Sequence, residues 1–465
     1  MNNQPRVVII GGGFGGLHAA RALAGAPVSV TLIDKRNYHL FRPMLYQVAT
    51  GLLSADQISG PLRSILRRQA NVEVLMDEVS GVDTGKRLVH LKQHSISYDY
   101  LVLATGIQYN YFGHDEWRRV APGLESLDDA DMIRGKILLA FERAEEMAAL
   151  DHADTEGIRQ LLTFVLVGAG TVGVEMASTL AEMSRMALAH DFRHINPSHA
   201  QILLYEAAPR VLPTFPEDLS AKAQRHLESL GVKVYTNTRV TGVDADGVVA
   251  GGQRVRSSTV LWGAGVLASP AGHWLGAAMD KSGKIIVGSD LSVPGHPEIF
   301  AIGDTAHVVA PSRNLLGIKS KEPMVMPGVA QPAIQEGRYV AALIRRRVAG
   351  QPPPAPFWYF GQRRSRDRGA YVRARRSSHA PLHRISGLGC LGSRAHLFPD
   401  RIREPILRHT AMGNGVSDQT SAGAGLSGTR TSRRSSIGRS FYRLRRLRCP
   451  YVWAWGKTQV RHLSR

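Results

Sequence analysis

A glycine-rich turn joins an apolar segment to a helix-forming segment at the start of the chain. Residues 6–34 read RVVIIGGGFGGLHAARALAGAPVSVTLID. An apolar, β-branched run is followed by glycines, then by an Ala- and Leu-rich stretch, and then by a second apolar run that ends at Asp34. This order predicts a complete βαβ unit, with a buried strand on each side of one helix. A chain that begins in this way is expected to build an α/β sheet.

The glycines of this unit have the spacing of a nucleotide cradle. Gly11, Gly13 and Gly16 form GxGxxG. The first glycine permits a tight turn, the second lets a pyrophosphate approach the backbone, and the third lets helix and strand pack closely. The helix N-terminus then faces the anion with free N–H groups and the positive end of its dipole. Asp34 is placed to accept hydrogen bonds from a ribose diol.

The same pattern recurs in the middle of the chain. Residues 161–183 read LLTFVLVGAGTVGVEMASTLAEM, and the next apolar run, QILLYE, ends at Glu206. Gly168, Gly170 and Gly173 repeat the GxGxxG spacing. The sequence therefore predicts two nucleotide sites.

The second unit is longer than the first. Its extra segment, residues 184–200, reads SRMALAHDFRHINPSHA and predicts a longer helix and a turn at Asn196-Pro197. Arg210 follows Glu206 closely and offers a charge for a 2′-phosphate, but the acid at the strand end favours NADH over NADPH.

Two further strands end in glycine-containing turns. They are YDYLVLATG, residues 98–106, and PEIFAIGDTA, residues 297–306. Either one is explained by burial alone, but in a dinucleotide fold Asp304 of the AIGD turn suits the ribityl or ribose hydroxyls of a flavin.

These pieces together resemble the two-dinucleotide-domain flavoproteins and, more closely, the type II NADH dehydrogenases, which are non-pumping NADH:quinone oxidoreductases. The stretch RNYHLFRPMLYQVATGLLSADQIS, residues 36–59, is similar to that family's segment after the flavin acid. GAGTVGVEMA resembles its NADH cradle, LYEAAPRVLP its second acid, and MPGVAQPAIQEG its quinone-side loop. The resemblance covers residues 6 to about 360.

The resemblance implies two Rossmann-like domains, the second inserted in the first. We expect an FAD-binding domain at residues 1–115 and 296–345, an NADH-binding domain at 116–295, and an atypical basic C-terminal region at 346–465. It further implies that hydride passes from NADH to FAD and that two electrons then pass to a membrane quinone without proton pumping.

The resemblance also implies the site residues. Glu175, Gln331 and Gln335 are the candidate catalytic residues: Glu175 beside the nicotinamide, in the first turn of its helix, and the two glutamines beside flavin and quinone. A helix that begins near Ala330 would direct its positive end at the reduced flavin. The expected cofactor-binding residues are Gly11, Gly13, Phe14, Gly16, Asp34, Lys35, Ala104, Thr105, Gly106, Gly168, Gly170, Gly173, Glu206, Gly265, Gly303, Asp304, Ala330 and Gln331.

Cysteine usage separates this chain from other flavin reductases. Its two cysteines, Cys390 and Cys449, both lie beyond residue 360. Disulfide reductases need a redox-active cysteine pair after the first cradle, and sulfide- or peroxide-reducing relatives need a catalytic cysteine. Electrons are therefore expected to leave the flavin directly. The histidines show no metal-ligand spacing, and no metal site is expected.

The charge of the chain is concentrated at its end. From residue 361 onward there are 23 Lys and Arg against 4 Asp and Glu, whereas residues 1–360 hold 35 against 34. The family's DKGxMATIG segment and apolar C-terminal helices are absent after FWYF. This arginine and serine bias is typical of a GC-rich gene read out of register and indicates a frameshift from about residue 361. A disordered basic tail that binds anionic lipid or nucleic acid is the alternative.

The partners follow from this interpretation. We expect quinone as the acceptor, no nucleic acid, a membrane surface from the family, and a homodimer as an option. The family's place is the cytoplasmic face of the inner membrane, as a peripheral protein, and loss of the anchor would leave a soluble protein. A cysteine-independent NADH oxidase or ferredoxin-type reductase is the alternative enzyme, and a basic nucleic-acid-binding or inactive product is the non-enzyme alternative.

Overall fold

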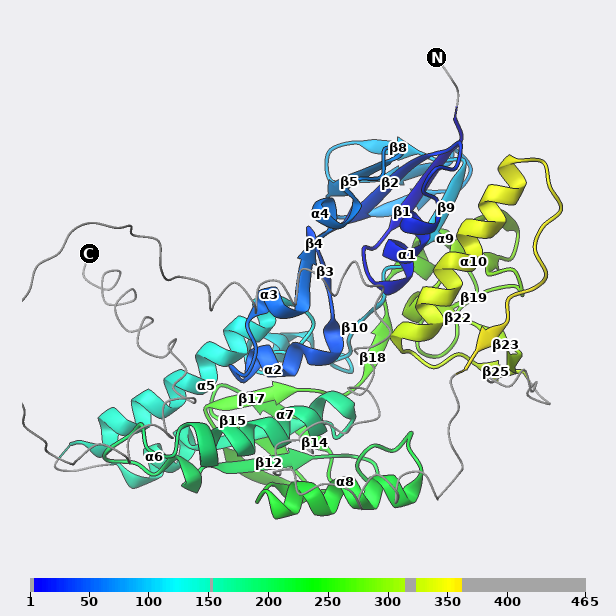
Figure 1. Cartoon of the computed structure of the whole chain (residues 1–465). Helices are drawn as coiled ribbons and strands as arrows, with labels where there is room; N and C mark the ends of the chain where they lie inside the picture. The colour runs from blue at the N-terminus through cyan, green and yellow to red at the C-terminus, as the bar shows by residue number, and fades with distance from the viewer. Residues whose placement is uncertain (1–3, 151–153, 314–322, 362–465) are drawn as a thin grey trace, which may run out of the picture. The chain divides into compact units, whose positions relative to one another are not determined.

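The first glycine-rich turn follows a central strand of a six-stranded sheet in the computed structural model of the chain (Figure 1). The structure describes residues 4–150, 154–313 and 323–361. The strand order is β20-β21-β9-β1-β2-β5, with the bounds Ser292–Val293, His296–Ala301, Tyr100–Leu103, Arg6–Ile10, Ser29–Asp34 and Val72–Met76. Neighbouring strands run parallel except β20 at the edge, which is antiparallel to β21.

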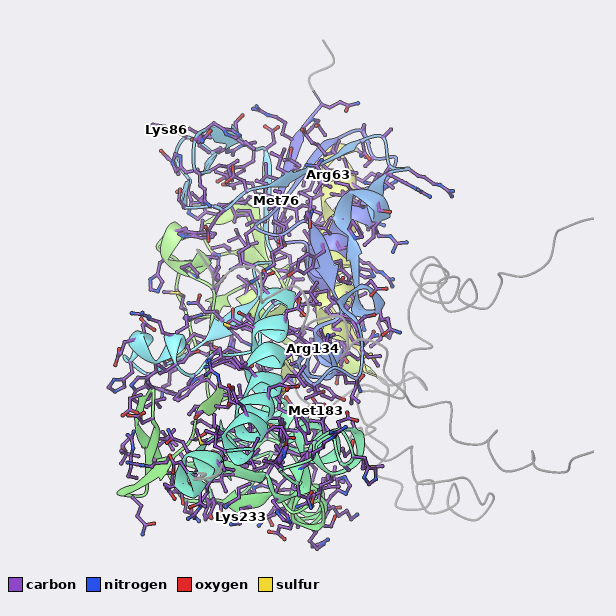
Figure 2. All side chains as sticks on the ribbon, turned by 90° about the vertical axis from the view of Figure 1, so that its left-hand side faces the viewer. Arg63, Met76, Lys86, Arg134, Met183 and Lys233 are labelled. Atoms are coloured by element: carbon purple, nitrogen blue, oxygen red, sulfur yellow. The ribbon has the colours of Figure 1, made fainter. Side chains whose placement is uncertain are left out.

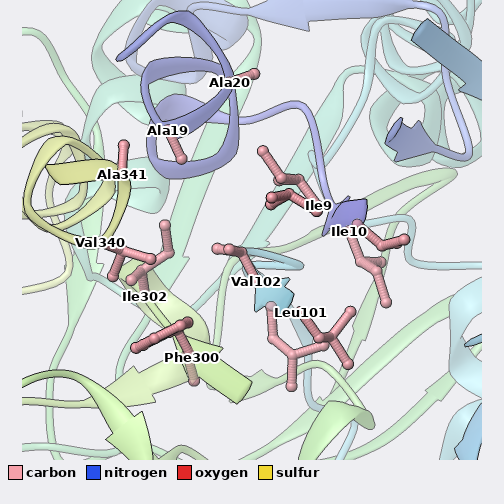
Figure 3. Close-up of a cluster of buried hydrophobic side chains, with 14 of the residues drawn as sticks. Ile9, Ile10, Ala19, Ala20, Leu101, Val102, Phe300, Ile302, Val340 and Ala341 are labelled. Atoms are coloured by element: carbon pink, nitrogen blue, oxygen red, sulfur yellow. The ribbon is translucent and has the colours of Figure 1, made fainter. Parts of the chain in front are cut away.

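Helices cover the apolar strands of this sheet. After its first residue, β1 is buried throughout, as expected for a parallel strand that is covered on both faces. Helix α1 (Phe14–Ala22) packs on this strand and also against α10 (Ala330–Val348), which lies alongside it in Figure 1. Figure 3 shows the core between these elements, with Ile9, Ala19, Val102, Phe300 and Val340 among its side chains.

The chain leaves the first sheet after β9 and returns to it at β20. The intervening residues form a four-stranded parallel sheet of order β13-β12-β11-β17, with bounds Lys233–Tyr235, Gln201–Tyr205, Thr163–Val167 and Thr259–Trp262. The predicted α/β class, with a second dinucleotide-type unit inserted in the first, is confirmed. The domain boundaries proposed from the sequence remain predictions.

Three strands of the second sheet, β11, β12 and β17, are buried on both faces, because their side chains alternate between two cores. Phe164 and Leu166 of β11 face the core that contains α5 (Leu127–Ala148), α7 (Thr171–Glu182) and α8 (Glu217–Ser229). Val165 and Val167 face the opposite core, which contains Trp262. Successive side chains of a strand point to opposite faces, which explains this alternation.

Segment 36–59 follows β2 of the first sheet and packs into one core of the second sheet. Its helix α2 (Leu45–Ala49) buries Leu45 and Val48 in the core of the second sheet, against α5. Gly51 follows α2 with a φ of +74°, and a Cβ there would lie 3.5 Å from Nε of Arg134. Arg134 of α5 is labelled in Figure 2.

Short elements complete the described chain. The remaining helices are α3 (Ala55–Ile58), α4 (Leu62–Leu66), α6 (Thr155–Leu161) and α9 (Ala271–Leu275). Two three-stranded antiparallel sheets join β6 (Gly81–Asp83), β7 (Leu88–His90) and β8 (Ser95–Ser97), and β14 (Val240–Asp244), β15 (Gly247–Ala250) and β16 (Gln253–Arg256). The two-stranded pairs are β3–β4 (Tyr38–Leu40, Ser59–Pro61), β10–β18 (Ile107–Tyr109, Val266–Ala268), β19–β22 (Ile285–Ile286, Ala306–His307), β23–β25 (Val309–Ala310, Met324–Val325) and β24–β26 (Ser312–Arg313, Tyr359–Phe360).

The long insertion of the second unit has the predicted turn at Asn196-Pro197 but not the predicted longer α-helix. Helix α7 ends at Glu182, and only one π-helical turn, Met183–Ala187, extends it before a 3₁₀ turn at Pro197–His199. Met183 is labelled in Figure 2. Glu145 of α5 holds the irregular part because its carboxylate accepts the backbone N–H groups of residues 193–195 at 2.9–3.0 Å. A side chain distant in sequence thus replaces the hydrogen bonds that a longer helix would make.

The C-terminal region is described as far as residue 361. Phe357 is buried in the first core, and β26 runs parallel to β24. The arginine-rich tract, both cysteines and the proposed frameshift product lie outside the described residues.

Candidate functional site

The carboxyl end of the first sheet gathers the residues predicted to bind the flavin. Gly11 follows β1, Asp34 ends β2, the Ala104-Thr105-Gly106 turn follows β9, and Gly303 and Asp304 follow β21. These four strands are neighbours in the sheet, so their ends meet along one edge. In open α/β sheets, ligands bind at this edge.

The first cradle has a closed side and an open side. Gly11 has a φ of +105°, and a Cβ at Gly16 would overlap the carbonyl oxygen of Gly11. The turn and the helix therefore need glycine at both places. At Gly13, a Cβ would have no atom within 4 Å. The second glycine thus faces open space, where a pyrophosphate would approach.

Asp34 is tied to the loop of this cradle. Its Oδ2 accepts the N–H of Gly12 at 2.6 Å, and its Oδ1 accepts the N–H of Arg36 at 2.7 Å. These hydrogen bonds orient the carboxylate at the end of β2, while each oxygen keeps a further lone pair for a ribose hydroxyl.

Hydroxyl side chains join the turns after β9 and β21. Oγ1 of Thr305 accepts the N–H of Gly106 at 2.8 Å and lies 3.2 Å from Oγ1 of Thr105. The Thr105 hydroxyl also contacts the hydroxyl of Ser269, which directly follows β18. The predicted flavin turns are therefore connected to the strand pair that leads to the second sheet.

Helix α10 begins at Ala330, as the sequence predicted, and the turn before it lies against Asp304. A Cβ on Gly328 would lie 2.7 Å from Oδ1 of Asp304, so this carboxylate rests against the turn that precedes Ala330. Behind the turn, Oε2 of Glu336 accepts the N–H of Gly303 at 2.6 Å. Burial raises the pKa of Glu336 to about 7, with a further upward contribution from Asp304 and opposing effects from the Gly303 N–H and Lys284.

The second cradle repeats the geometry of the first. Gly168 has a φ of +94°, a Cβ at Gly173 would overlap the carbonyl oxygen of Gly168, and Gly170 faces open space. Glu206 accepts the N–H of Ala169 at 2.6 Å and that of Ala208 at 2.8 Å.

Arg210 is occupied by its own loop. Its guanidinium donates to the carbonyl oxygens of Phe215 and Pro213, each at 2.9 Å. Because these bonds hold the guanidinium in the loop, the arrangement favours a nucleotide without a 2′-phosphate.

Glu175 lies beyond the first turn of its helix, and the sequence-based placement was wrong in this respect. Helix α7 begins at Thr171 and has no acid in its first turn. The helix dipole therefore does not account for this acid. Burial raises the pKa of Glu175 to about 7. Helix α2 packs against α7. Burial and then the charge of Glu175 raise the pKa of the Tyr46 phenol on α2.

The two candidate glutamines occupy different places on α10. Gln331 is half-buried in the first turn of the helix. Gln335 donates to the carbonyl oxygen of Phe360 at 3.3 Å and accepts its N–H at 3.0 Å. Its amide therefore holds strand β26. The catalytic roles of both residues remain predictions.

The other predicted ligands lie near the cradles. Phe14 packs edge-on against His39, with ring centroids 5.0 Å apart, and Lys35 is exposed beyond Asp34. Gly265 follows β17 with a φ of +66°, and a Cβ there would lie 2.6 Å from Cζ of Phe112. Their binding roles remain predictions.

Sequence reasoning missed Glu336, His39 and Thr305. His39 is buried, and its Nδ1 pairs with the carbonyl oxygen of Gly12 at 3.0 Å. Burial lowers its pKa. For Glu336 a signal existed, because the residue occupies the same helical face as Ala333, Val340 and Ile344. An acid on an otherwise apolar face indicates a specific partner.

Comparisons with known proteins agree with this geometry. The model of the pyridine nucleotide-disulphide oxidoreductase family matches residues 5–337. A Mycobacterium tuberculosis protein named type II NADH:quinone oxidoreductase NdhA is 44% identical over 379 residues, which cover 78% of this chain and 76% of the relative. A second protein of that organism, type II NADH:quinone oxidoreductase Ndh, is 42% identical over 76% of each chain. This chain belongs to the type II NADH:quinone oxidoreductases.

Solved structures share the fold of this type II oxidoreductase. NDH2 from Plasmodium falciparum, solved in complex with NADH, has a TM-score of 0.65 at 20% identity and covers 77% of this chain and 87% of its own. The sulfide:quinone oxidoreductase from Aquifex aeolicus has a TM-score of 0.58 at 19% identity and covers 75% and 78% of the two chains.

Proposed function

We propose that the protein oxidises NADH and reduces a quinone, with FAD in the first cradle and NADH in the second. The observation that carries the proposal is the presence of two complete dinucleotide cradles in a chain without a cysteine before residue 390. When bound, FAD supplies hydride acceptance from NADH and two-electron transfer to the quinone.

The first cradle supplies groups that fit FAD. Gly13 leaves room for the pyrophosphate, and Asp34 offers its carboxylate to the adenosine ribose. Asp304 offers its carboxylate to the ribityl chain. The N-terminal N–H groups of α10, near Ala330 and Gln331, stabilise negative charge at the flavin edge.

The second cradle supplies groups that fit NADH. Glu206 accepts hydrogen bonds from the adenosine ribose and repels a 2′-phosphate. Arg210 supports this selectivity because its guanidinium stays bonded to Phe215 and Pro213.

Glu175 is proposed to hold a proton beside the reacting rings. Its pKa of about 7 lets the carboxyl exchange protons near neutral pH, which suits a general acid or base. Gln331 and Gln335 are proposed to lie on the acceptor side of the flavin.

The acceptor distinguishes this proposal from the alternatives. The purified protein is mixed anaerobically with NADH and then with a short-chain quinone, oxygen or a ferredoxin-type protein, while flavin absorbance is followed. We expect bleaching by NADH and fastest recovery with the quinone. Faster recovery with oxygen or the protein acceptor would identify an NADH oxidase or a ferredoxin-type reductase. A colourless protein that takes up no flavin would support the non-enzyme alternative.

We also propose peripheral attachment to the cytoplasmic face of the membrane, where a quinone is available. Among residues 4–150, 154–313 and 323–361, no helix has the length and apolar character needed to cross a membrane. Flotation with anionic vesicles tests attachment, and light scattering tests the proposed homodimer. We retain residues 1–115 with 296–345 as the FAD domain and 116–295 as the NADH domain.

A further inference from the structure

Glu336 is an unusual residue for the interior of a protein. Only 1% of its surface is exposed, and it is the one buried acid among the described residues. A buried carboxyl is costly unless it makes hydrogen bonds, so its partner identifies what it does.

The partner of Glu336 is the backbone of the turn after β21. Oε2 accepts the N–H of Gly303 at 2.6 Å. Gly303 has a φ of +65°, in the left-handed region that favours glycine. The carboxyl therefore holds the first residue of the 3₁₀ turn Gly303–Thr305, directly before Asp304.

Close helix packing sets the depth of Glu336. The next residue, Gly337, lies so near α1 that a Cβ on it would overlap the carbonyl oxygen of Gly15. Ile302 fills the neighbouring space against Gly15, at 3.0 Å from a Cβ there. Figure 3 shows Ile302 beside Val340, which lies one turn after Glu336 on α10. A rigid contact between two helices thus fixes the carboxyl.

The turn that carries Asp304 is held from both sides. Glu336 binds Gly303 before it, and Thr305 after it bonds the N–H of Gly106. The Asp304 carboxylate itself rests against Gly328. Loss of the Glu336 bond would release one side of the turn and leave the Gly303 N–H without this acceptor.

We propose that Glu336 is a positioning residue for the flavin, which acts by holding the Gly303 N–H and so placing Asp304 against the cofactor. This inference rests on the proposed function, in which the first sheet binds FAD.

The hydrogen bond of Glu336 does not require its carboxyl to be charged. Asp304 and Lys284 are the charged groups that face it, and their effects oppose one another. A protonated carboxyl keeps a carbonyl oxygen that accepts the Gly303 N–H, as a glutamine amide would. The inference therefore predicts that Glu336→Gln retains flavin and that variants without a reaching acceptor do not.

The test measures flavin release from the full-length holoprotein. Release rates of FAD are followed by the rise of flavin fluorescence on dilution for the wild type, Glu336→Gln, Glu336→Asp and Glu336→Ala. We expect release about tenfold faster for the Ala and Asp variants, the effect of one lost hydrogen bond, and less than about threefold faster for Gln. The visible circular dichroism of the remaining bound flavin should change in the Ala and Asp variants only.

Glu145→Ala is the matched control. It removes another carboxylate that accepts backbone N–H groups, but on the insertion of the second unit. We expect lower thermal stability with a wild-type rate of flavin release. General destabilisation is thereby separated from loss of positioning.

The outcomes are distinguishable. Wild-type release rates in Glu336→Ala would overturn the inference and leave the proposed function intact, because the protein would still be yellow. If that variant does not fold, equal release from the Asp and Gln variants overturns the inference, and faster release from Asp supports it. A wild type that binds no FAD would defeat the proposed function, and this inference with it.

Discussion

The two cradles share one local geometry but differ in how the chain assembles around them. In each, the first glycine has a positive φ, the second faces open space, and a strand-end acid accepts an N–H of the loop at 2.6 Å. The second cradle is built from one continuous stretch, from β11 to Gly265. The first also receives a turn and a helix from far along the chain, with Asp304 and α10.

This difference indicates how the same glycine motif can bind a cofactor that stays in place and a nucleotide that exchanges. In the first cradle, α10 packs on α1, and its Glu336 holds the Gly303 turn beside the glycine loop. That arrangement fits a cofactor that stays bound. In the described chain, no distant turn or helix is added to the glycine loop of the second cradle. This more open arrangement fits a nucleotide that exchanges in each turnover.

The largest effect is expected from substitutions that disrupt one cradle at a time. Gly16→Val and Gly173→Val place equivalent side chains where a Cβ overlaps the preceding loop. We expect Gly16→Val to lose flavin and to lose about 4 kcal/mol or more of unfolding free energy. Gly173→Val should remain yellow but should not be bleached by NADH. Flavin absorbance with and without NADH decides, and the same phenotype in both variants would contradict the assignment.

The next effect concerns the proton at Glu175. Burial raises its pKa to about 7, so the carboxyl holds a proton below that pH and loses it above. If this proton is used, quinone reduction should fall as the pH rises through about 7. Glu175→Gln should remove this dependence and lower the rate at pH 6 by roughly 10- to 100-fold. An unchanged pH–rate profile in the variant would exclude the role.

A smaller effect compares the two strand-end acids. Glu206→Gln should raise the KM for NADH about tenfold, the value of one hydrogen bond to a charged acceptor, and should reduce discrimination against NADPH. Asp34→Asn should weaken flavin binding and leave the KM for NADH unchanged in the loaded enzyme. Steady-state kinetics with both nucleotides measure this. Equal changes in the KM for NADH in Glu206→Gln and Asp34→Asn would contradict the assignment of the two acids to different nucleotides.

The last effect concerns the stability of the fold and leaves the reaction itself unchanged. In the folded protein the pKa of Glu336 is raised from an ordinary value of 4.5 to about 7. The protonated carboxyl therefore contributes its full share to the free energy of unfolding below pH 4.5, and this share is lost as the pH rises through 7. Glu336→Gln, which cannot ionise, should gain roughly 1 to 3 kcal/mol relative to the wild type between pH 4.5 and 8. Denaturant unfolding of both proteins at pH 4.5 and at pH 8 measures this difference in the free energy of unfolding. A constant difference would contradict the raised pKa.

The sequence predicted the parts of the fold that depend on local pattern. Apolar runs, glycine spacing and strand-end acids are encoded within a few residues, so β1, α1, β2 and their second copy were found with their ligand edges. The start of α10 near Ala330 was also predicted, since a Pro-Gly turn precedes it.

Long-range contacts account for what was missed. The insertion of the second unit takes its shape from Glu145, a residue about fifty positions earlier in the chain. The position of Glu336 on an apolar helical face indicates a partner, but that the partner is Gly303 depends on how α10 packs on α1. Gln335 likewise pairs with Phe360, beyond the end of its own helix.

The central claim is that NADH in the second cradle passes a pair of electrons directly to FAD in the first, without a cysteine as an intermediate carrier. An anaerobic titration of the purified holoprotein with NADH tests this most directly. The account predicts one bound flavin per chain and complete bleaching after one equivalent of NADH, because residues 1–360 contain no cysteine pair that could take a second pair of electrons. A requirement for two equivalents, or a flavin that NADH leaves oxidised, would contradict it.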